Sequence, residues 1–233
     1  MVVARHAARQ MLATFICLIV WSGGANADTV RAAKGQLNAL TPATVLPQIP
    51  VVGCRGGRAL LYDECGSQIA IYEAALAQAV AQDKVLLVSY GAEWCIWCHL
   101  FATYIHGTHT RFTHTYSDSS DNMRYTSTMY ERPTGNPKPS AVKLAKYFAD
   151  SFVLAHIESR YSPDGAEVLA MSGAQTAYQG GLPFIYSVDA QGRFATSFDY
   201  ALAETRRDTD DWYRGYDRAK LLKELIRMKV AAQ

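Results

Sequence analysis

The apolar positions of this chain recur with two different spacings, and the spacing changes where turn-forming residues stand. Intervals of three and four residues, as in Leu221, Leu225 and Met228, predict helices with one buried face, and continuous apolar runs, as over 84–90, predict buried strands. The expected helices cover 67–82, 95–105, 140–151, 166–178 and 217–230, and the expected strands cover 84–90, 152–157, 184–188 and 193–198. This order predicts an α/β fold in which helices flank a central mixed β-sheet.

Two stretches interrupt the pattern. Residues 28–66 form an N-terminal extension that begins with a proline-containing lead-in and ends in a turn-rich segment, for which a short hairpin is expected. Within the domain predicted over 67–233, residues 106–139 are rich in Thr, Ser, Tyr and His and carry few aliphatic side chains. A loop of this length is uncommon in a compact domain and is usually functional, so residues 106–139 are interpreted as an insertion.

The start of the chain is typical of an export signal. Arg5 and Arg9 precede an apolar, uncharged run over 11–21, and small residues follow, ending in Ala25-Asn26-Ala27. This order predicts a secretory signal peptide over 1–27, cleaved after Ala27, and a periplasmic or otherwise exported mature protein. The alternative is an uncleaved anchor, but the run is shorter than the ~20 residues that span a membrane, so no stable membrane insertion is expected after cleavage.

Charge and cysteine content narrow the class of partner. The chain has 23 Lys and Arg and 21 Asp and Glu, and residues 1–27 carry two arginines and no acid, which leaves 21 of each sign. This balance gives no indication of nucleic acid as a partner.

The cysteines that remain after residue 27 are Cys54, Cys65, Cys95 and Cys98. An even number of cysteines in an exported protein favours disulfide chemistry.

Cys95 and Cys98 stand where the strand expected over 84–90 gives way to a helix. The unpaired N–H groups and the positive dipole end of a helix N-terminus favour a thiolate over a thiol. Cys95 is therefore expected to be an exposed nucleophile, and Cys98, one turn further in, is expected to resolve a mixed disulfide.

The segment over 72–98, which ends in Trp94-Cys95-Ile96-Trp97-Cys98, resembles exported members of the thioredoxin superfamily, and residues 181–184, Gly-Leu-Pro-Phe, resemble that family's cis-proline loop. The resemblance implies a thioredoxin-like thiol–disulfide oxidoreductase without a cofactor. Its partners would be thiols or disulfides of exported proteins, a partner redox protein or a membrane-linked electron donor. The implied substrate-binding residues are Trp94, Ile96, Trp97, Leu182 and Pro183, with Pro183 in a cis peptide bond.

One position departs from the family. Cytoplasmic reductants of the family often carry a buried Asp where this chain has Ser89, and that Asp takes the proton of the resolving cysteine. In this chain the remaining acceptors are Glu93, His99 or water, and Glu93 and His99 are the residues expected to modulate the pair. The absence of the Asp speaks against fast reductase behaviour.

Other interpretations of the same residues stay open. Cys95-Ile-Trp-Cys98-His99 also matches the attachment motif of a c-type haem, and a thioredoxin-like domain can serve as a non-catalytic binding module. Cys54 and Cys65 are expected to form a structural disulfide, with a second redox pair or a four-cysteine zinc site as alternatives.

The polar insertion has its own alternatives. Its histidines, His106, His109 and His114, are a candidate metal set but are more simply side chains of a solvated loop. Tyrosines in the same region are a candidate contact surface for a protein client: Tyr104, Tyr116, Tyr125 and Tyr130. The charged run over 204–211 is expected to be a solvated loop.

Overall fold

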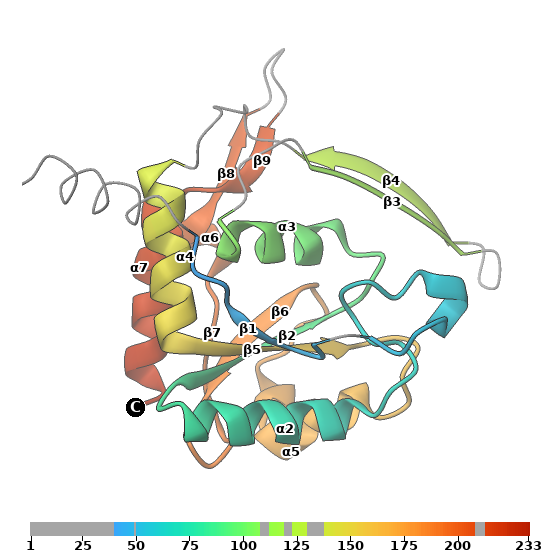
Figure 1. Cartoon of the computed structure of the whole chain (residues 1–233), viewed down its shortest axis with the longest axis horizontal. Coiled ribbons are helices and arrows are strands. Elements are labelled where there is room, and N and C mark those ends of the chain that lie inside the picture. Colours follow the sequence, from blue (N-terminus) through green and yellow to red (C-terminus); the bar gives the residue numbers. More distant parts are fainter. Residues whose placement is uncertain (1–39, 49, 108–111, 119–122, 130–137, 208–212) are drawn as a thin grey trace, which may run out of the picture.

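The computed structural model describes residues 40–48, 50–107, 112–118, 123–129, 138–207 and 213–233, and a five-stranded sheet lies at its centre (Figure 1). The strands are β1 (Thr44–Leu46), β2 (Val85–Gly91), β5 (Phe152–Glu158), β6 (Phe184–Val188) and β7 (Phe194–Ser197), in the spatial order β1-β5-β2-β6-β7. β1, β5 and β2 run parallel to one another, whereas β6 and β7 pair in antiparallel fashion. The predicted α/β fold around a mixed sheet is therefore confirmed.

Helices cover both faces of this sheet. α2 (Gln68–Ala81) and α5 (Gly165–Ser172) pack on one face, and α3 (Ile96–Ile105), α4 (Pro139–Ser151) and α7 (Arg218–Ala231) pack on the other (Figure 1). Two large apolar clusters fill the two interfaces. Because both faces are covered, the central strands β2 and β5 are buried along their whole length, which explains their continuous apolar runs.

The alternation of side chains along β2 decides what lies beneath α3. Leu86 and Val88 belong to the cluster under α2, whereas Leu87 belongs to the cluster under α3. Ser89 and Gly91 have the same parity as Leu87 and therefore face α3. This placement of a hydroxyl and a missing side chain beneath the cysteine-bearing helix is central to the site described below.

Local capping explains where several helices begin and end. The Ser67 hydroxyl accepts a hydrogen bond from the Ala70 N–H at 3.3 Å, and Asp217 accepts one from the Lys220 N–H at 2.9 Å. The helix predicted over 166–178 is shorter than expected, because Gly173 adopts a left-handed conformation (φ 75°) that ends α5. A short 3-10 helix, η2 (Ala174–Thr176), follows it.

The N-terminal extension contains structure that the sequence pattern did not predict. Its lead-in supplies β1, which pairs with β5 through three residues and is too short to show a period. The segment expected to form a hairpin instead contains a 3-10 helix, η1 (Cys54–Gly57). Left-handed backbone at Gly53, Gly56 and Gly57 allows that tight turn.

The two polar stretches interpreted as loops also contain strands. β3 (Phe112–Asp118) and β4 (Met123–Met129) form an antiparallel hairpin within the 106–139 insertion, and β8 (Glu204–Arg207) pairs with β9 (Tyr213–Tyr216) after the short helix α6 (Tyr200–Ala203). The first hairpin lies beside α3 and β9 (Figure 1). Thr and Tyr favour strands without creating an apolar pattern, so apolar runs do not mark these four strands.

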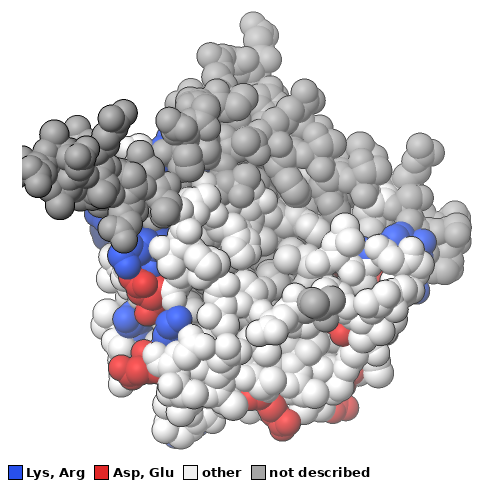
Figure 2. Space-filling view, in the orientation of Figure 1, with Lys and Arg blue, Asp and Glu red and all other residues white. Residues whose placement is uncertain are grey.

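The charged surface agrees with the balanced composition. Figure 2 shows basic and acidic side chains interspersed along one edge of the molecule, and the coloured residues of this face form no broad area of one sign.

None of the helices in the described part of the chain is long and apolar enough to cross a membrane.

A buried glutamine connects the extension to the sheet. Gln68, the first residue of α2, is fully buried; its Nε2 donates to the carbonyl oxygens of Asp63 (2.7 Å) and Gly66 (3.0 Å), and its Oε1 accepts from the Glu158 N–H (2.7 Å). One side chain thus bonds three backbone groups, of which the Asp63 carbonyl and the Glu158 N–H are buried.

Replacing Gln68 with alanine is expected to lower the free energy of unfolding by about 2–3 kcal/mol, because the buried Asp63 carbonyl and Glu158 N–H lose this partner. Denaturant unfolding measures the change. The matched control is Gln78→Ala on the same helix, where the side chain is half-buried and the expected change is within about 0.5 kcal/mol. Equal losses in the two variants would contradict the assignment.

Candidate active site

The two cysteines lie at the junction of β2 and α3. β2 ends at Gly91, and Cys95 is the N-cap of α3, with its sulfur accepting a hydrogen bond from the Cys98 N–H at 3.3 Å. Cys95 and Cys98 are joined in a disulfide. A helix N-terminal N–H group therefore points at the sulfur that the sequence assigns as the nucleophile.

Cys95 and Cys98 differ little in solvent exposure, although Cys95 is expected to be the exposed one. Cys95 is 4% exposed and Cys98 is fully buried, so the expectation that Cys95 is an exposed residue is wrong as stated. The reason is that Trp94 and Leu182 pack against the cysteines. Cys95 nevertheless lines a pocket of about 290 Å³.

This pocket is formed by the start of α3 and by the loop before β6. The residues that line it are Trp94, Cys95, Ile96, Trp97, Tyr178, Gly180 and Leu182. Four of the five predicted substrate-binding residues are thus brought together here. The fifth, Pro183, is buried beside the pocket, and the Leu182–Pro183 peptide bond is cis, as the resemblance implies.

A tyrosine that sequence reasoning missed fixes the proline loop. The Tyr200 hydroxyl donates to the Pro183 carbonyl oxygen and accepts from the Ile185 N–H at 3.2 Å. Burial raises the pKa of Tyr200 above the usual range of a phenol, so its hydroxyl stays protonated. No sequence signal marked this residue, because it lies in a short helix after the sheet.

The aromatic residues of the motif face different surroundings. Trp97 packs edge-to-face on Tyr216, with ring centroids 5.9 Å apart, while Ile96 joins the core beneath α3. Tyr178, which also lines the pocket, packs on Tyr90 with ring centroids 5.3 Å apart. The pocket walls are therefore held by the interior on both sides.

Glu93 ties the N-terminal extension to the cysteine helix. Its Oε2 accepts hydrogen bonds from the N–H groups of Leu61 (2.9 Å) and Tyr62 (3.0 Å), and His99 Nε2 lies 3.2 Å from its Oε1. Burial alone would raise the pKa of Glu93, but His99 and the two N–H groups together lower it. Glu93 and His99 are thus bound to each other, and the carboxylate serves to hold residues 61–62.

Those contacts bring Tyr62 under the disulfide. Tyr62 is fully buried in a cluster with Ala92, Cys95 and Cys98, and its hydroxyl is hydrogen-bonded to Ser89 at 2.9 Å. A Cβ atom at position 91 would lie 2.5 Å from the Tyr62 hydroxyl oxygen and 2.7 Å from the Cys98 sulfur. Neither Tyr62 nor Gly91 was singled out from the sequence; the apolar Leu60-Leu61-Tyr62 run between two cysteines was the available signal.

The second cysteine pair forms the disulfide expected for it. Cys54 and Cys65 are bonded across a separation of 11 residues, which closes the loop that carries Tyr62. All four described cysteines are therefore in disulfides, and this state is incompatible with a four-cysteine zinc site.

The expectations for the insertion fall partly on described residues. Within the described part of the chain no cluster of three metal-ligating side chains occurs; His109 and the side chain of His114 lie outside it. Tyr104 and Tyr116 are buried, so they do not form a client surface, and Tyr130 and the side chain of Tyr125 lie outside the described residues.

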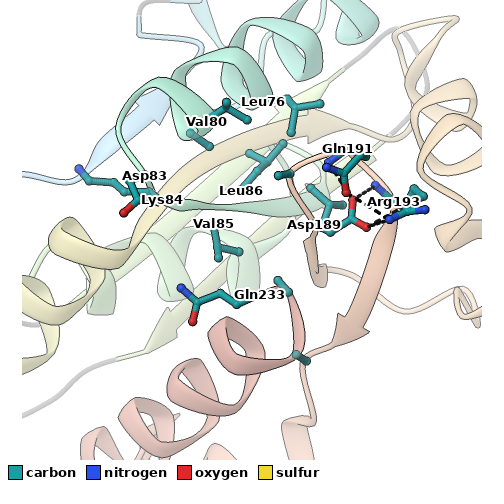
Figure 3. Close-up of a pocket in the computed structure, with 15 residues that line it drawn as sticks. Leu76, Val80, Asp83, Lys84, Val85, Leu86, Asp189, Gln191, Arg193 and Gln233 are labelled. Carbon is teal, nitrogen blue, oxygen red and sulfur yellow. Dashed lines mark hydrogen bonds and ion pairs between the residues drawn. The ribbon is translucent and has the colours of Figure 1, made fainter.

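A larger pocket, of about 530 Å³, lies at the opposite end of β2 (Figure 3). Its lining includes Val85, Lys84, the turn between β6 and β7 and the C-terminal Gln233. In this pocket Asp189 accepts a hydrogen bond from Arg193 Nε at 2.8 Å, so the negative charge of Asp189 and the positive charge of Arg193 neutralise each other. It contains no cysteine and is remote from the disulfide.

No protein-family model matches the sequence, and a search of curated proteins finds no significant match.

Substituting Gly91 with alanine is expected to destabilise the protein by about 1–3 kcal/mol, because the new methyl group would overlap the Tyr62 hydroxyl and the Cys98 sulfur. Denaturant unfolding measures the loss. Gly181→Ala is the control for stability, since a Cβ there meets nothing within 4 Å. An unchanged midpoint for Gly91→Ala would show that this contact is not tight.

The contribution of Glu93 to stability should depend on pH. Its pKa is below the ordinary value of 4.5 in the folded protein, so its contribution is complete above that pH and is lost as the pH falls through the folded value. The difference in unfolding free energy between the wild type and Glu93→Gln should be constant above about pH 5 and shrink in more acidic solution. A difference independent of pH would refute this role.

Proposed function

We propose that this protein is a thioredoxin-like thiol–disulfide oxidoreductase that acts through Cys95 and Cys98. The observation that carries the proposal is the Cys95 sulfur at the N-cap of α3, receiving the Cys98 N–H at 3.3 Å and opening onto a pocket bordered by a cis-proline loop. Such a site stabilises a thiolate and offers an extended peptide a place beside it.

The architecture supports the same class. The order β1-β5-β2-β6-β7, in which β1, β5 and β2 pair in parallel and β6 pairs antiparallel with both β2 and β7, is compatible with a thioredoxin-like sheet. The cysteine pair follows the carboxyl end of the central strand β2, which is where open α/β sheets generally bind ligands. The N-terminal extension and the β3–β4 hairpin are then additions around that core.

The reaction is an exchange in two steps. The Cys95 thiolate attacks a disulfide of the client, an S–S bond forms between Cys95 and one client sulfur, and the other client sulfur leaves. Cys98 then attacks Cys95, the Cys95–Cys98 bond forms and the client departs reduced. The reverse sequence oxidises a client dithiol, so the reduction potential of the pair sets the direction.

Export is part of the proposal. The signal-like segment over 1–27 lies outside the described residues, and its proposed removal after Ala27 places the protein in the periplasm or another exported location. The Cys54–Cys65 disulfide supports an oxidising compartment. Clients are then cysteines of exported proteins, and a membrane-linked donor or a partner redox protein resets the pair.

Burial argues against the haem alternative. A haem attached at this motif needs both sulfurs for thioethers and the His99 ring for iron. Cys98 is fully buried beside Gly91, and His99 Nε2 lies 2.7 Å from the Glu93 carbonyl oxygen. Attachment would require both groups to leave these positions.

In the reduced protein, the Cys95 thiol is expected to titrate at least one unit below the ~8.5 of a free cysteine. Alkylation rates across a pH series measure this. Cys95→Ser should abolish disulfide exchange, and Cys98→Ser should trap the mixed disulfide. Gln78→Ala, on α2 at the other face of the sheet, is the matched control and should keep the low Cys95 pKa.

Two results would contradict the proposed function. Equal turnover of a disulfide substrate by the wild type and Cys95→Ser would leave a non-catalytic binding module as the better description. A Soret band in the purified protein would favour the haem protein.

A further inference from the structure

Three polar atoms meet beside Gly91 of β2: the Tyr62 hydroxyl oxygen, Ser89 Oγ and the Cys98 sulfur. The Tyr62 hydroxyl is bonded to Ser89 Oγ at 2.9 Å, and both it and the Cys98 sulfur border the space above Gly91, 2.5 and 2.7 Å from the point that a Cβ would occupy. Because both distances start from the same point, the distance between the Tyr62 hydroxyl oxygen and the Cys98 sulfur is at most their sum. Tyr62, Ser89 and Cys98 are all fully buried.

Tyr62 is held in this place from several sides. Its N–H donates to Glu93 at 3.0 Å, its ring packs on His156 with centroids 4.9 Å apart, and the Cys54–Cys65 disulfide closes its loop. Burial raises the pKa of the Tyr62 hydroxyl well above that of a free phenol, which the bond to Ser89 offsets only in part. The hydroxyl is therefore a proton donor to hydrogen bonds and not a base.

We propose that Tyr62 stabilises the thiolate of Cys98, with the Tyr62 O–H donating to the sulfur and the Ser89 O–H donating to the Tyr62 oxygen. This proposal rests on the proposed function, since it assigns how the resolving cysteine is activated. In the disulfide state the Cys98 sulfur is bonded to Cys95, and opening that bond creates the anion that the hydroxyl then meets. Tyr62 acts as a positioning residue for the resolving cysteine, and the N-terminal extension becomes part of the site.

The step balances without an added oxidant or reductant. The Cys98 thiol gives its proton to water, the thiolate attacks Cys95 Sγ in the mixed disulfide, the Cys95–Cys98 bond forms, and the bond from Cys95 to the client sulfur breaks. The client sulfur leaves with the electron pair and takes up one proton. Tyr62 and Ser89 keep their protons throughout and only supply hydrogen bonds, which favour the charged form of Cys98.

Other titratable groups around Cys98 do not replace this donor. Glu93 accepts from residues 61–62 and lies beside His99 on the α3 side. On β5, His156 stands opposite Ser89 in register, and burial lowers its pKa to about 3, so it is uncharged at neutral pH. Glu158 and Tyr200 also act on Tyr62, and both raise the pKa of its hydroxyl. Cys95 is removed in the experiment below.

The test measures the Cys98 pKa by thiolate absorbance in a Cys95→Ser background, where Cys98 is the free thiol while Cys54–Cys65 stays closed. Tyr62→Phe should raise this pKa by about one unit, because a hydrogen bond to a charged group is lost. Ser89→Ala should raise it less, since Tyr62 remains. Tyr72→Phe is the matched control: its buried hydroxyl donates to the Gly192 carbonyl at 2.6 Å, away from the cysteines, and the pKa should not change.

With Cys95 restored, Tyr62→Phe should slow resolution of the mixed disulfide at neutral pH about threefold, since a tenfold smaller thiolate fraction is partly offset by a stronger nucleophile. An unchanged Cys98 pKa in folded Tyr62→Phe and Ser89→Ala would overturn the inference while leaving wild-type exchange intact. Absence of exchange in the wild type would instead refute the proposed function, and the Cys98 pKa would still report on Tyr62.

Discussion

The close approach of α3 to β2 at Gly91 is the constraint on which the site depends. Because position 91 has no side chain, the Cys98 sulfur and the Tyr62 hydroxyl can share the space above the strand. Cys95 then falls at the N-cap of α3, where the helix offers an N–H group to its sulfur. Geometry at one glycine thus sets both the burial of the inner sulfur and the orientation of the outer one.

The loop closed by Cys54 and Cys65 is coupled to this constraint through hydrogen bonds to buried groups. Glu93 accepts two of its N–H groups. Gln68 donates to the carbonyl oxygen of Asp63 in the loop and to that of Gly66 just after it, and accepts from the N–H of Glu158 in β5. A carboxylate that is buried needs such partners, since an unpaired charge in the interior is strongly unfavourable. The extension is therefore bound at the sheet end that carries the cysteines, and loss of its order would expose Glu93.

The sequence predicted what is encoded locally. The apolar run of β2 and the placement of Cys95 and Cys98 where β2 gives way to α3 depend on residues close in the chain, and the family resemblance implied the cis bond before Pro183. Tyr62, by contrast, meets Ser89 across 27 positions, and Tyr200 meets Pro183 across 17, so no periodic pattern marks either contact. β1 escaped prediction because three residues show no period, and the β3–β4 hairpin because its strands are polar.

The serine beneath α3 changes the chemistry that the interior can perform. An Asp at position 89 would take a proton from Cys98, but as an anion it would also lie in an apolar region already occupied by Tyr62. A hydroxyl pair costs less to bury, because the two uncharged groups share a hydrogen bond. Because burial raises the pKa of Tyr62, its hydroxyl stays protonated at neutral pH. The hydroxyl can therefore donate a hydrogen bond to a Cys98 thiolate, but it cannot take the proton from a Cys98 thiol. In the proposed exchange, water takes the Cys98 proton and the client sulfur leaves as an anion, so the acidity of the client thiol should govern how fast the mixed disulfide resolves.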